Sequence, residues 1–149
     1  MGESRELTTT ECRRLLEGGV VGRVAVGSPT GPHIVPVNYS VVDDSIIFRT
    51  TPYSLLGTHG RNAMLAFEVD HFDYAEQRGW SVLARGRADT VTDPVEIAHI
   101  RDTWPPRPWA DGTRNLYFRL PWTELTGRRL GNGWTVDNEA PVHRYVGAH

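Results

Sequence analysis

The stretch from His33 to Leu56 places the tightest constraint on the fold, because it reads as two strands, a tight turn between them and the start of a helix. The first strand places four apolar side chains on one face: Val35, Val37, Tyr39 and Val41. The run Asp43-Asp44-Ser45 supplies turn residues, and Ser45 to Thr50 follows as the second strand. This order predicts an antiparallel hairpin that leads directly into a helix.

The end of that hairpin carries the residues that point most clearly to chemistry. Thr51 is the predicted N-cap of a short helix of about residues 52–58, which begins on proline. A helix N-terminus offers unpaired N–H groups and a partial positive charge to an anion. Because Arg49, Ser54 and the hydroxyls of Thr50 and Thr51 lie at this helix start in the sequence, we predict that these four residues form a phosphate-binding pocket.

The rest of the chain predicts more strands than helices. Further strands are expected in four ranges, which are 20–28, 63–70, 79–92 and 115–120. A last short strand is expected just before residue 130. Two further helices are expected, after the capping box Thr8-x-x-Glu11 and after Asp93-Pro94. With about six strands, three short helices and no βαβ alternation, the predicted fold is mainly β, an antiparallel sheet closed into a barrel.

Three local features add detail to this barrel. Pro36 cannot donate to a strand ladder, so it is expected at an edge, a bulge or an opening, where a planar ligand could approach the backbone. Gly86 in the middle of a strand predicts a bend. The helix after Asp93 is expected to bury one stripe: Ile97, Ile100 and Trp104. The proline-rich segment that follows, up to Trp109, reads as a rigid lid or a dimer contact.

Length and composition set broader limits. A chain of 149 residues suggests one domain, residues 1–149, with peripheral tails at 1–7 and 131–149 and a loose start at residues 1–6. A net charge of −2 gives no reason to expect nucleic acid. The single Cys12 and the lack of a membrane-length apolar run favour a cytoplasmic protein that does not enter a membrane. The histidines show no metal spacing and no nucleophile motif is present, so catalytic residues stay unknown and a cofactor would carry any reaction.

Five stretches, taken in order, resemble the motifs of a known family: Val21–Val26, Pro36–Tyr39, Phe48–Thr50, Phe67–Asp70 with Gly79–Val82, and Thr126–Arg129. This is the pyridoxamine 5′-phosphate oxidase-like family of split-barrel, FMN-binding proteins, and the likeness is greatest to its small actinobacterial-type branch. The resemblance covers about residues 8–130. It implies a Greek-key-like split barrel of about six antiparallel strands and a homodimer with FMN at the subunit interface. It also implies flavin-dependent oxidoreductase activity on a small organic substrate.

The same resemblance implies which residues contact the flavin ring. Pro36, Val37 and Asn38 correspond to the strand that faces the pyrimidine end of the flavin. Ser81 is similar to the polar residue that meets an isoalloxazine carbonyl, and Trp80 is its neighbour. Two later residues resemble positions that reach the cofactor of the partner: Trp122 and Arg128.

For the phosphate, the resemblance implies three residues: Arg49, Thr50 and Ser54. Family members usually place Lys or Arg just after this serine, whereas this chain has Leu55 and Leu56. Arg49, Arg61 or His59 could supply the missing charge. Two alternatives to an FMN enzyme therefore stay open: reduction with the deazaflavin coenzyme, and a non-enzymatic flavin-binding module.

Overall fold

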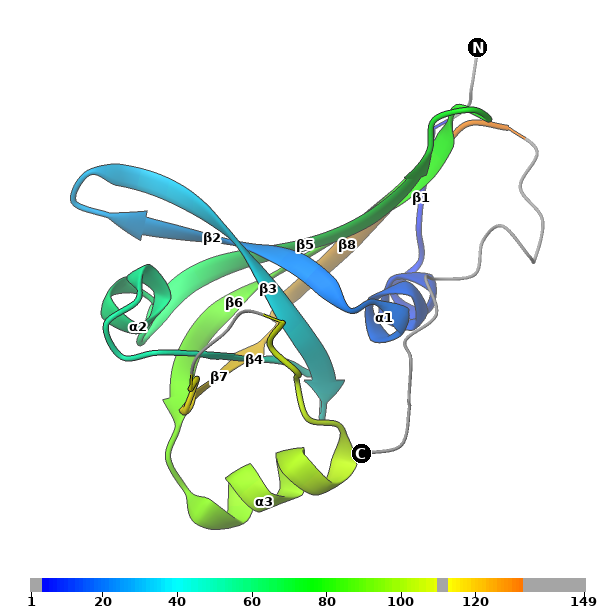
Figure 1. Cartoon of the computed structure of the whole chain (residues 1–149). Helices are drawn as coiled ribbons and strands as arrows, with labels where there is room; N and C mark the ends of the chain where they lie inside the picture. Colours follow the sequence, from blue (N-terminus) through cyan, green and yellow to red (C-terminus); the bar gives the residue numbers. More distant parts are fainter. Residues whose placement is uncertain (1–3, 110–112, 133–149) are drawn as a thin grey trace.

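The computed structural model of the chain describes residues 4–109 and 113–132, which form eight strands and three helices (Figure 1). Most of the predicted tail at residues 131–149 lies outside these ranges. The elements in chain order are β1 (Ser4–Glu6), α1 (Thr9–Gly18), β2 (Val21–Ser28), β3 (Gly31–Val42), β4 (Ser45–Thr50), α2 (Leu55–His59), β5 (Ala63–Asp73), β6 (Arg78–Val91), α3 (Pro94–Thr103), β7 (Leu116–Pro121) and β8 (Glu124–Leu130).

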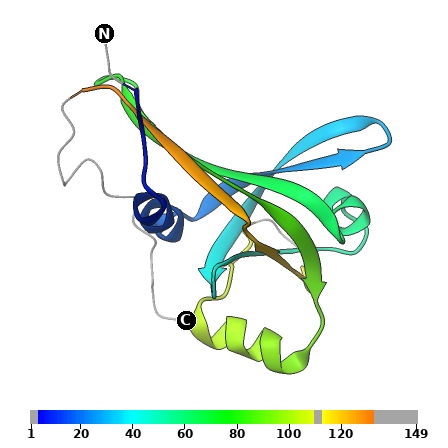
Figure 2. The same cartoon turned by 180° about the vertical axis from the view of Figure 1, so that it is seen from behind.

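Six strands close into a barrel in the order β6–β5–β2–β3–β4–β7, because β7 returns to pair with β6. β8 and β1 extend the sheet beyond β6, and all these pairings are antiparallel. Seen from behind (Figure 2), β8 runs alongside β6, and α1 packs against β8. The prediction of a mainly β, closed antiparallel barrel of about six strands is therefore confirmed.

Two long strands split the barrel, because each changes partner along its length. β3 pairs with β2 as far as Asn38 and with β4 from Tyr39 onward. β6 pairs with β8 as far as Arg85 and with β7 from Asp89 onward. Among the described strands, the half of β3 that contains Pro36 has β2 as its one neighbour. Pro36 thus lies on an open edge, as its missing N–H predicts.

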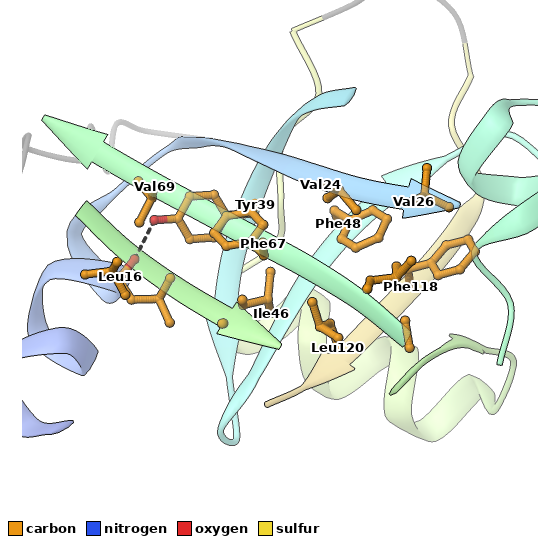
Figure 3. Close-up of a cluster of buried hydrophobic side chains, with 14 of the residues drawn as sticks. Leu16, Val24, Val26, Tyr39, Ile46, Phe48, Phe67, Val69, Phe118 and Leu120 are labelled. Atoms are coloured by element: carbon orange, nitrogen blue, oxygen red, sulfur yellow. Dashed lines mark hydrogen bonds between the residues drawn. The ribbon is translucent and has the colours of Figure 1, made fainter. Parts of the chain in front are cut away.

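The interior of the barrel is filled by aromatic and aliphatic side chains from alternate strand positions (Figure 3). Phe48 stacks on Phe118 with ring centroids 5.2 Å apart, and Tyr39 meets Phe67 edge-on at 4.6 Å. Such pairs add about 0.5–1.5 kcal/mol each beyond the burial of their surface. The Tyr39 hydroxyl also donates to the Leu16 carbonyl at 2.6 Å, which ties the last turn of α1 to the core.

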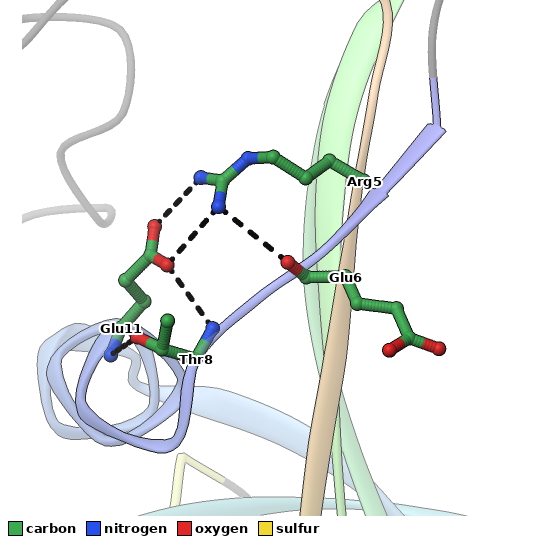
Figure 4. Close-up of polar contacts among 4 residues, drawn as sticks. All are labelled: Arg5, Glu6, Thr8 and Glu11. Atoms are coloured by element: carbon green, nitrogen blue, oxygen red, sulfur yellow. Dashed lines mark hydrogen bonds and ion pairs between the residues drawn. The ribbon is translucent and has the colours of Figure 1, made fainter.

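The first described residues correct the expectation of a loose start, since residues 4–6 form β1 on the edge of β8. The predicted capping box is confirmed, because Thr8 and Glu11 exchange two backbone-to-side-chain hydrogen bonds. Arg5 donates to both carboxylate oxygens of Glu11, at 2.8 and 3.3 Å (Figure 4). A strand of three polar residues has no signal of its own in the sequence; pairing with β8 and this ion pair hold it in place.

The second helix starts later than predicted. α2 begins at Leu55 with Ser54 as its N-cap, and Thr51 lies in the turn before it, so the prediction that Thr51 caps a helix at residues 52–58 is wrong. Ser54 takes this role because its hydroxyl accepts the Gly57 N–H at 3.0 Å. Both residues carry a capping hydroxyl, and the sequence alone does not distinguish them.

The third helix begins as predicted, with Asp93 as its N-cap and Pro94 in its first turn. Ile100 is buried against β3, β4 and β6, where it packs with Val42, Ile47 and Val91. The prediction that Trp104 belongs to the buried stripe is wrong: it is 36% exposed, because its backbone is extended and leaves the helical period. No helix in the described ranges is long and apolar enough to cross a membrane.

Gly86 lies where β6 leaves β8 and approaches β7. A Cβ at this position would lie against the backbone oxygen of Pro121, at the end of β7. We predict that Gly86→Ala lowers the free energy of unfolding by about 1–3 kcal/mol, because the backbone has to move. Gly27→Ala is the matched control, since its Cβ would meet no atom within 4 Å. Urea titration measures both variants, and equal midpoints would contradict the close approach.

The ion pair of Glu11 makes the stability depend on pH. The Arg5 guanidinium, with the Thr8 N–H second, lowers the pKa of Glu11 to about 2. Because this folded-state pKa lies below the ordinary value of 4.5, the contribution is complete above about pH 4.5 and is lost as the pH falls towards 2. We predict that the Glu11→Gln variant, which keeps the capping box, loses less unfolding free energy than the wild type across this range. Urea titrations at each pH measure this, and parallel curves would assign the dependence to other carboxylates.

Candidate functional site

The hydroxyl groups at the end of β4 meet at the start of α2. Ser54 Oγ lies 2.6 Å from Thr50 Oγ1 and donates to the Thr51 carbonyl at 2.8 Å. The same oxygen accepts the Gly57 N–H, so its hydrogen-bonding capacity is used within the chain. Thr50 is buried and Ser54 is half-buried. A phosphate bound here would replace one of these internal hydrogen bonds.

Arg49 extends from the last part of β4 towards β7. Its Nε donates to the Arg114 carbonyl at 2.9 Å, and its guanidinium carbon lies 5.1 Å from the centroid of the Tyr117 ring. These two contacts fix the plane of the guanidinium. In the part of the chain that the structure describes, its Nη nitrogens make no hydrogen bond. Arg49 therefore presents a cation in a fixed position, and its Nη–H groups are available to donate hydrogen bonds to an anion.

The other predicted phosphate contacts lie at the far end of α2. His59 is half-buried in the last turn, and Arg61 donates through Nε to the Gly57 carbonyl at 3.0 Å. Leu56 is buried, and Leu55 packs against the barrel core. The two leucines thus serve packing, which explains why neither position carries a basic side chain. Arg49 remains the cation nearest in sequence to the Thr50 and Ser54 hydroxyls.

Asn38 lies at the end of the open edge of β3. Its Oδ1 accepts the Trp109 N–H at 2.8 Å, whereas its Nδ2 is buried and has no hydrogen-bond partner among the described residues. A buried amide donor without a partner costs about 1–3 kcal/mol. Pro36 and Val37 precede it; Pro36 is exposed, and Val37 packs towards the core. This stretch therefore offers an open backbone edge that ends in an unpaired donor.

Ser81 and Trp80 lie on another part of the sheet. Ser81 pairs in register with Asp70 of β5 and with Arg128 of β8. Continuing the register across β5 and β2 places Ser81 three strands from Asn38, about 14 Å at the usual strand spacing. Trp80 is 2% exposed and belongs to the barrel core, so it does not share the outer surface with Ser81. The predicted ring contacts therefore form two groups rather than one.

The two residues predicted to reach the cofactor of a partner both have contacts within the chain. Trp122 packs against the core, and the Arg13 guanidinium lies 5.7 Å from its ring centroid. Arg128 is exposed on β8 and donates to Ser4 Oγ at 2.9 Å. Their role towards a partner stays a prediction.

Ser40, a polar residue two positions beyond Asn38 on β3, is not among the residues predicted from the sequence. Ser40 is fully buried, and its hydroxyl has no partner in residues 4–109 and 113–132. The signal was present in the sequence: Asn38 and Ser40 alternate with the apolar residues of the strand, so they share one face. At this end of the strand the face is covered, because Val42 on the same side packs against α3.

Comparisons with known proteins agree with this architecture. A family model described as pyridoxamine 5′-phosphate oxidase matches residues 8–129. The uncharacterized protein Rv0080 of Mycobacterium tuberculosis is 31% identical over 130 residues, 84% of each chain. The structure of the FAD binding protein from Mycobacterium smegmatis shares 31% identity and a TM-score of 0.72, over 85% of this chain and 98% of that one. A Corynebacterium glutamicum structure, described as a candidate pyridoxamine 5′-phosphate oxidase, shares 30% identity and a TM-score of 0.74, over 89% and 96%.

The barrel is closed and antiparallel, is split by two strands that change partner, and is open along one edge. These features define the class of split-barrel proteins. The match over most of the length defines the group within it: the chain belongs to the pyridoxamine 5′-phosphate oxidase family. The resemblance drawn from five short motifs is therefore confirmed.

Ser54 is a structural residue of this site whatever binds there. We predict that Ser54→Ala lowers the free energy of unfolding by about 1 kcal/mol, because α2 loses its N-cap. Thr58→Ala is the control, since Thr58 lies on the same helix with an exposed side chain. Guanidinium titration of the two variants measures the effect. A Ser54→Ala protein as stable as the control would show that the cap contributes nothing.

Proposed function

We propose that this protein binds a flavin, FMN by preference, and acts as a flavin-dependent oxidoreductase on a small organic substrate. The observation that carries the proposal is the fold shared with the FAD binding protein of M. smegmatis, at 31% identity across 98% of that chain. FMN and FAD have the same ring and the same first phosphate. The likeness therefore supports a flavin, and the preference for FMN rests on the motifs in the sequence.

The structure fits such a ligand on the outer face of β3 and β4. Tyr39 pairs in register with Phe48, so Asn38 and Arg49 are adjacent on neighbouring strands and share this face. Asn38 holds a buried amide hydrogen without a partner in the described ranges, which a ring carbonyl would satisfy. The Nη nitrogens of Arg49 suit a phosphate. One ligand with a polar ring edge and an anionic tail could therefore contact both residues.

The protein would contribute binding and orientation rather than acid–base chemistry. When bound, the flavin supplies hydride transfer at its ring nitrogen N5. Asn38 would hold the ring edge, and Arg49 would neutralise the phosphate. Thr50 and Ser54 would line the approach to the tail, with Ser54 keeping its role as the cap of α2.

We also propose that the protein forms a homodimer in the cytoplasm, with the cofactor at the subunit interface. Support comes from apolar side chains that the outer face of the sheet leaves exposed on four neighbouring strands: Val21, Ile34, Met64 and Leu83. Ile34 is 72% and Met64 51% exposed. Exposed apolar residues gathered on one sheet face favour association, and a second copy of the chain would cover them.

A second candidate is reduction with the deazaflavin coenzyme. The observation that favours it is the packing of Leu55 and Leu56 on the core, where a basic residue for the FMN phosphate is usual. A third is a non-enzymatic module that binds a flavin without turnover. Titration with FMN and with deazaflavin, followed by an assay with hydride donors, distinguishes these candidates: deazaflavin binding alone supports the second, and flavin binding without turnover supports the third.

Arg49 provides the directed test of the phosphate contact. We predict that Arg49→Ala weakens FMN and FAD binding at least about tenfold, because a hydrogen bond to a charged group contributes about 1.5–3 kcal/mol. Riboflavin, which lacks the phosphate, should bind both proteins equally. Arg14→Ala is the control, since Arg14 is exposed on α1. Fluorescence titration measures all three ligands, and an equal loss for riboflavin would remove Arg49 from the phosphate site.

A further inference from the structure

Two buried polar groups lie side by side on β3 without partners. Within the described residues, neither Asn38 Nδ2 nor Ser40 Oγ has a hydrogen bond. Ser40 is fully buried. The two residues are two positions apart in one strand, so their side chains leave the same face about 7 Å apart. This face is the outer one, because the alternate residue Tyr39 points into the barrel core.

Such an arrangement is unfavourable for the protein alone. Each unsatisfied buried group costs about 1–3 kcal/mol, and an apolar side chain of similar size would avoid this cost. Val42, the next residue on this face, shows that an apolar residue is accommodated there, packed with Ile47 and Ile100. The polar residues at 38 and 40 are therefore better explained by a binding partner than by folding.

The loop that follows α3 determines which hydrogen-bonding groups a ligand of Asn38 and Ser40 must have. We call residues 104–109, which follow α3, the strap; three of its six residues are prolines. The Trp109 N–H donates to Asn38 Oδ1. This hydrogen bond occupies the acceptor of the side-chain amide, so the Nδ2 donor remains available for a ligand. The ligand must therefore present an acceptor to Asn38, while the Ser40 hydroxyl can donate or accept. A planar heterocycle with a carbonyl beside a ring N–H has this pattern.

We propose that Ser40 binds the carbonyl and ring-nitrogen edge of the cofactor together with Asn38, and that the strap is the gate to this site. The inference rests on the proposed function, since the flavin ring carries such an edge. A gate is required because both polar atoms are sealed from solvent. Trp109 is 72% exposed, so its ring contributes little burial to the closed strap. Trp109 acts here as a positioning residue, through the hydrogen bond that orients Asn38.

Ser40→Ala tests the ligand contact with two readouts. We expect the free protein to be as stable as the wild type or more stable, because an unpaired hydroxyl is removed, while riboflavin binds about tenfold more weakly. Ser45→Ala is the matched control: Ser45 is a buried serine on β4 whose hydroxyl donates to the Asp43 carbonyl, so its loss should leave riboflavin affinity unchanged. Thermal unfolding and fluorescence titration measure the two effects.

The outcomes separate this inference from the proposed function. Two outcomes would overturn the role of Ser40 and leave the proposed function standing. In the first, the Ser40→Ala variant binds riboflavin as tightly as the wild type. In the second, the ligand-free Ser40→Ala variant is clearly less stable than the wild type. Wild-type protein that binds no flavin would overturn both. For the gate, Trp109→Pro removes the N–H that holds Asn38, so riboflavin should associate faster in stopped-flow mixing. An unchanged association rate would show that the strap does not control entry.

Discussion

The passage of the end of β7 over β6 at Gly86 is the contact on which the architecture depends. The absence of a side chain at Gly86 admits the Pro121 carbonyl, and next to it the Thr123 N–H donates to the Arg85 carbonyl at 2.8 Å. β6 can then exchange β8 for β7, which closes the barrel. The candidate site depends on the same contact, because β7 carries Tyr117, the ring on which the Arg49 guanidinium rests.

The parts of this fold that the sequence predicts are those with a local cause. Ser45 to Thr50 is a strand because turn residues precede it and a short run of β-branched and aromatic residues fills it, and the structure gives these bounds. Asp93 and Pro94 begin a helix because a capping carboxylate and a fixed φ act within one turn. The open edge at Pro36 follows from one missing N–H. The five motifs identified the family because their order reflects the whole barrel.

The parts that sequence analysis missed depend on residues distant in the chain. β1 forms because β8 offers an edge, and Trp104 turns outward because the helix ends there. Leu56 is buried by the core, a fact that its place after Ser54 does not reveal. For the site, the sequence singled out Asn38 and Arg49 but could not show that they are adjacent. Nor could it show that Ser40 is buried, because its neighbours Val42 and Ile47 on that face are covered by α3, which lies more than fifty residues further along the chain.

The open half of β3 has a consequence for solubility. A bare strand edge is normally a template on which another chain can add a strand and begin an aggregate. On this edge Pro32 and Pro36 are four residues apart, so they lie on the same side of the strand, opposite Gly27 and Arg23 of β2. Neither has an N–H to offer an incoming strand. The two prolines therefore leave the backbone edge accessible while they disfavour fibre growth. Any redesign of this edge would have to keep both prolines.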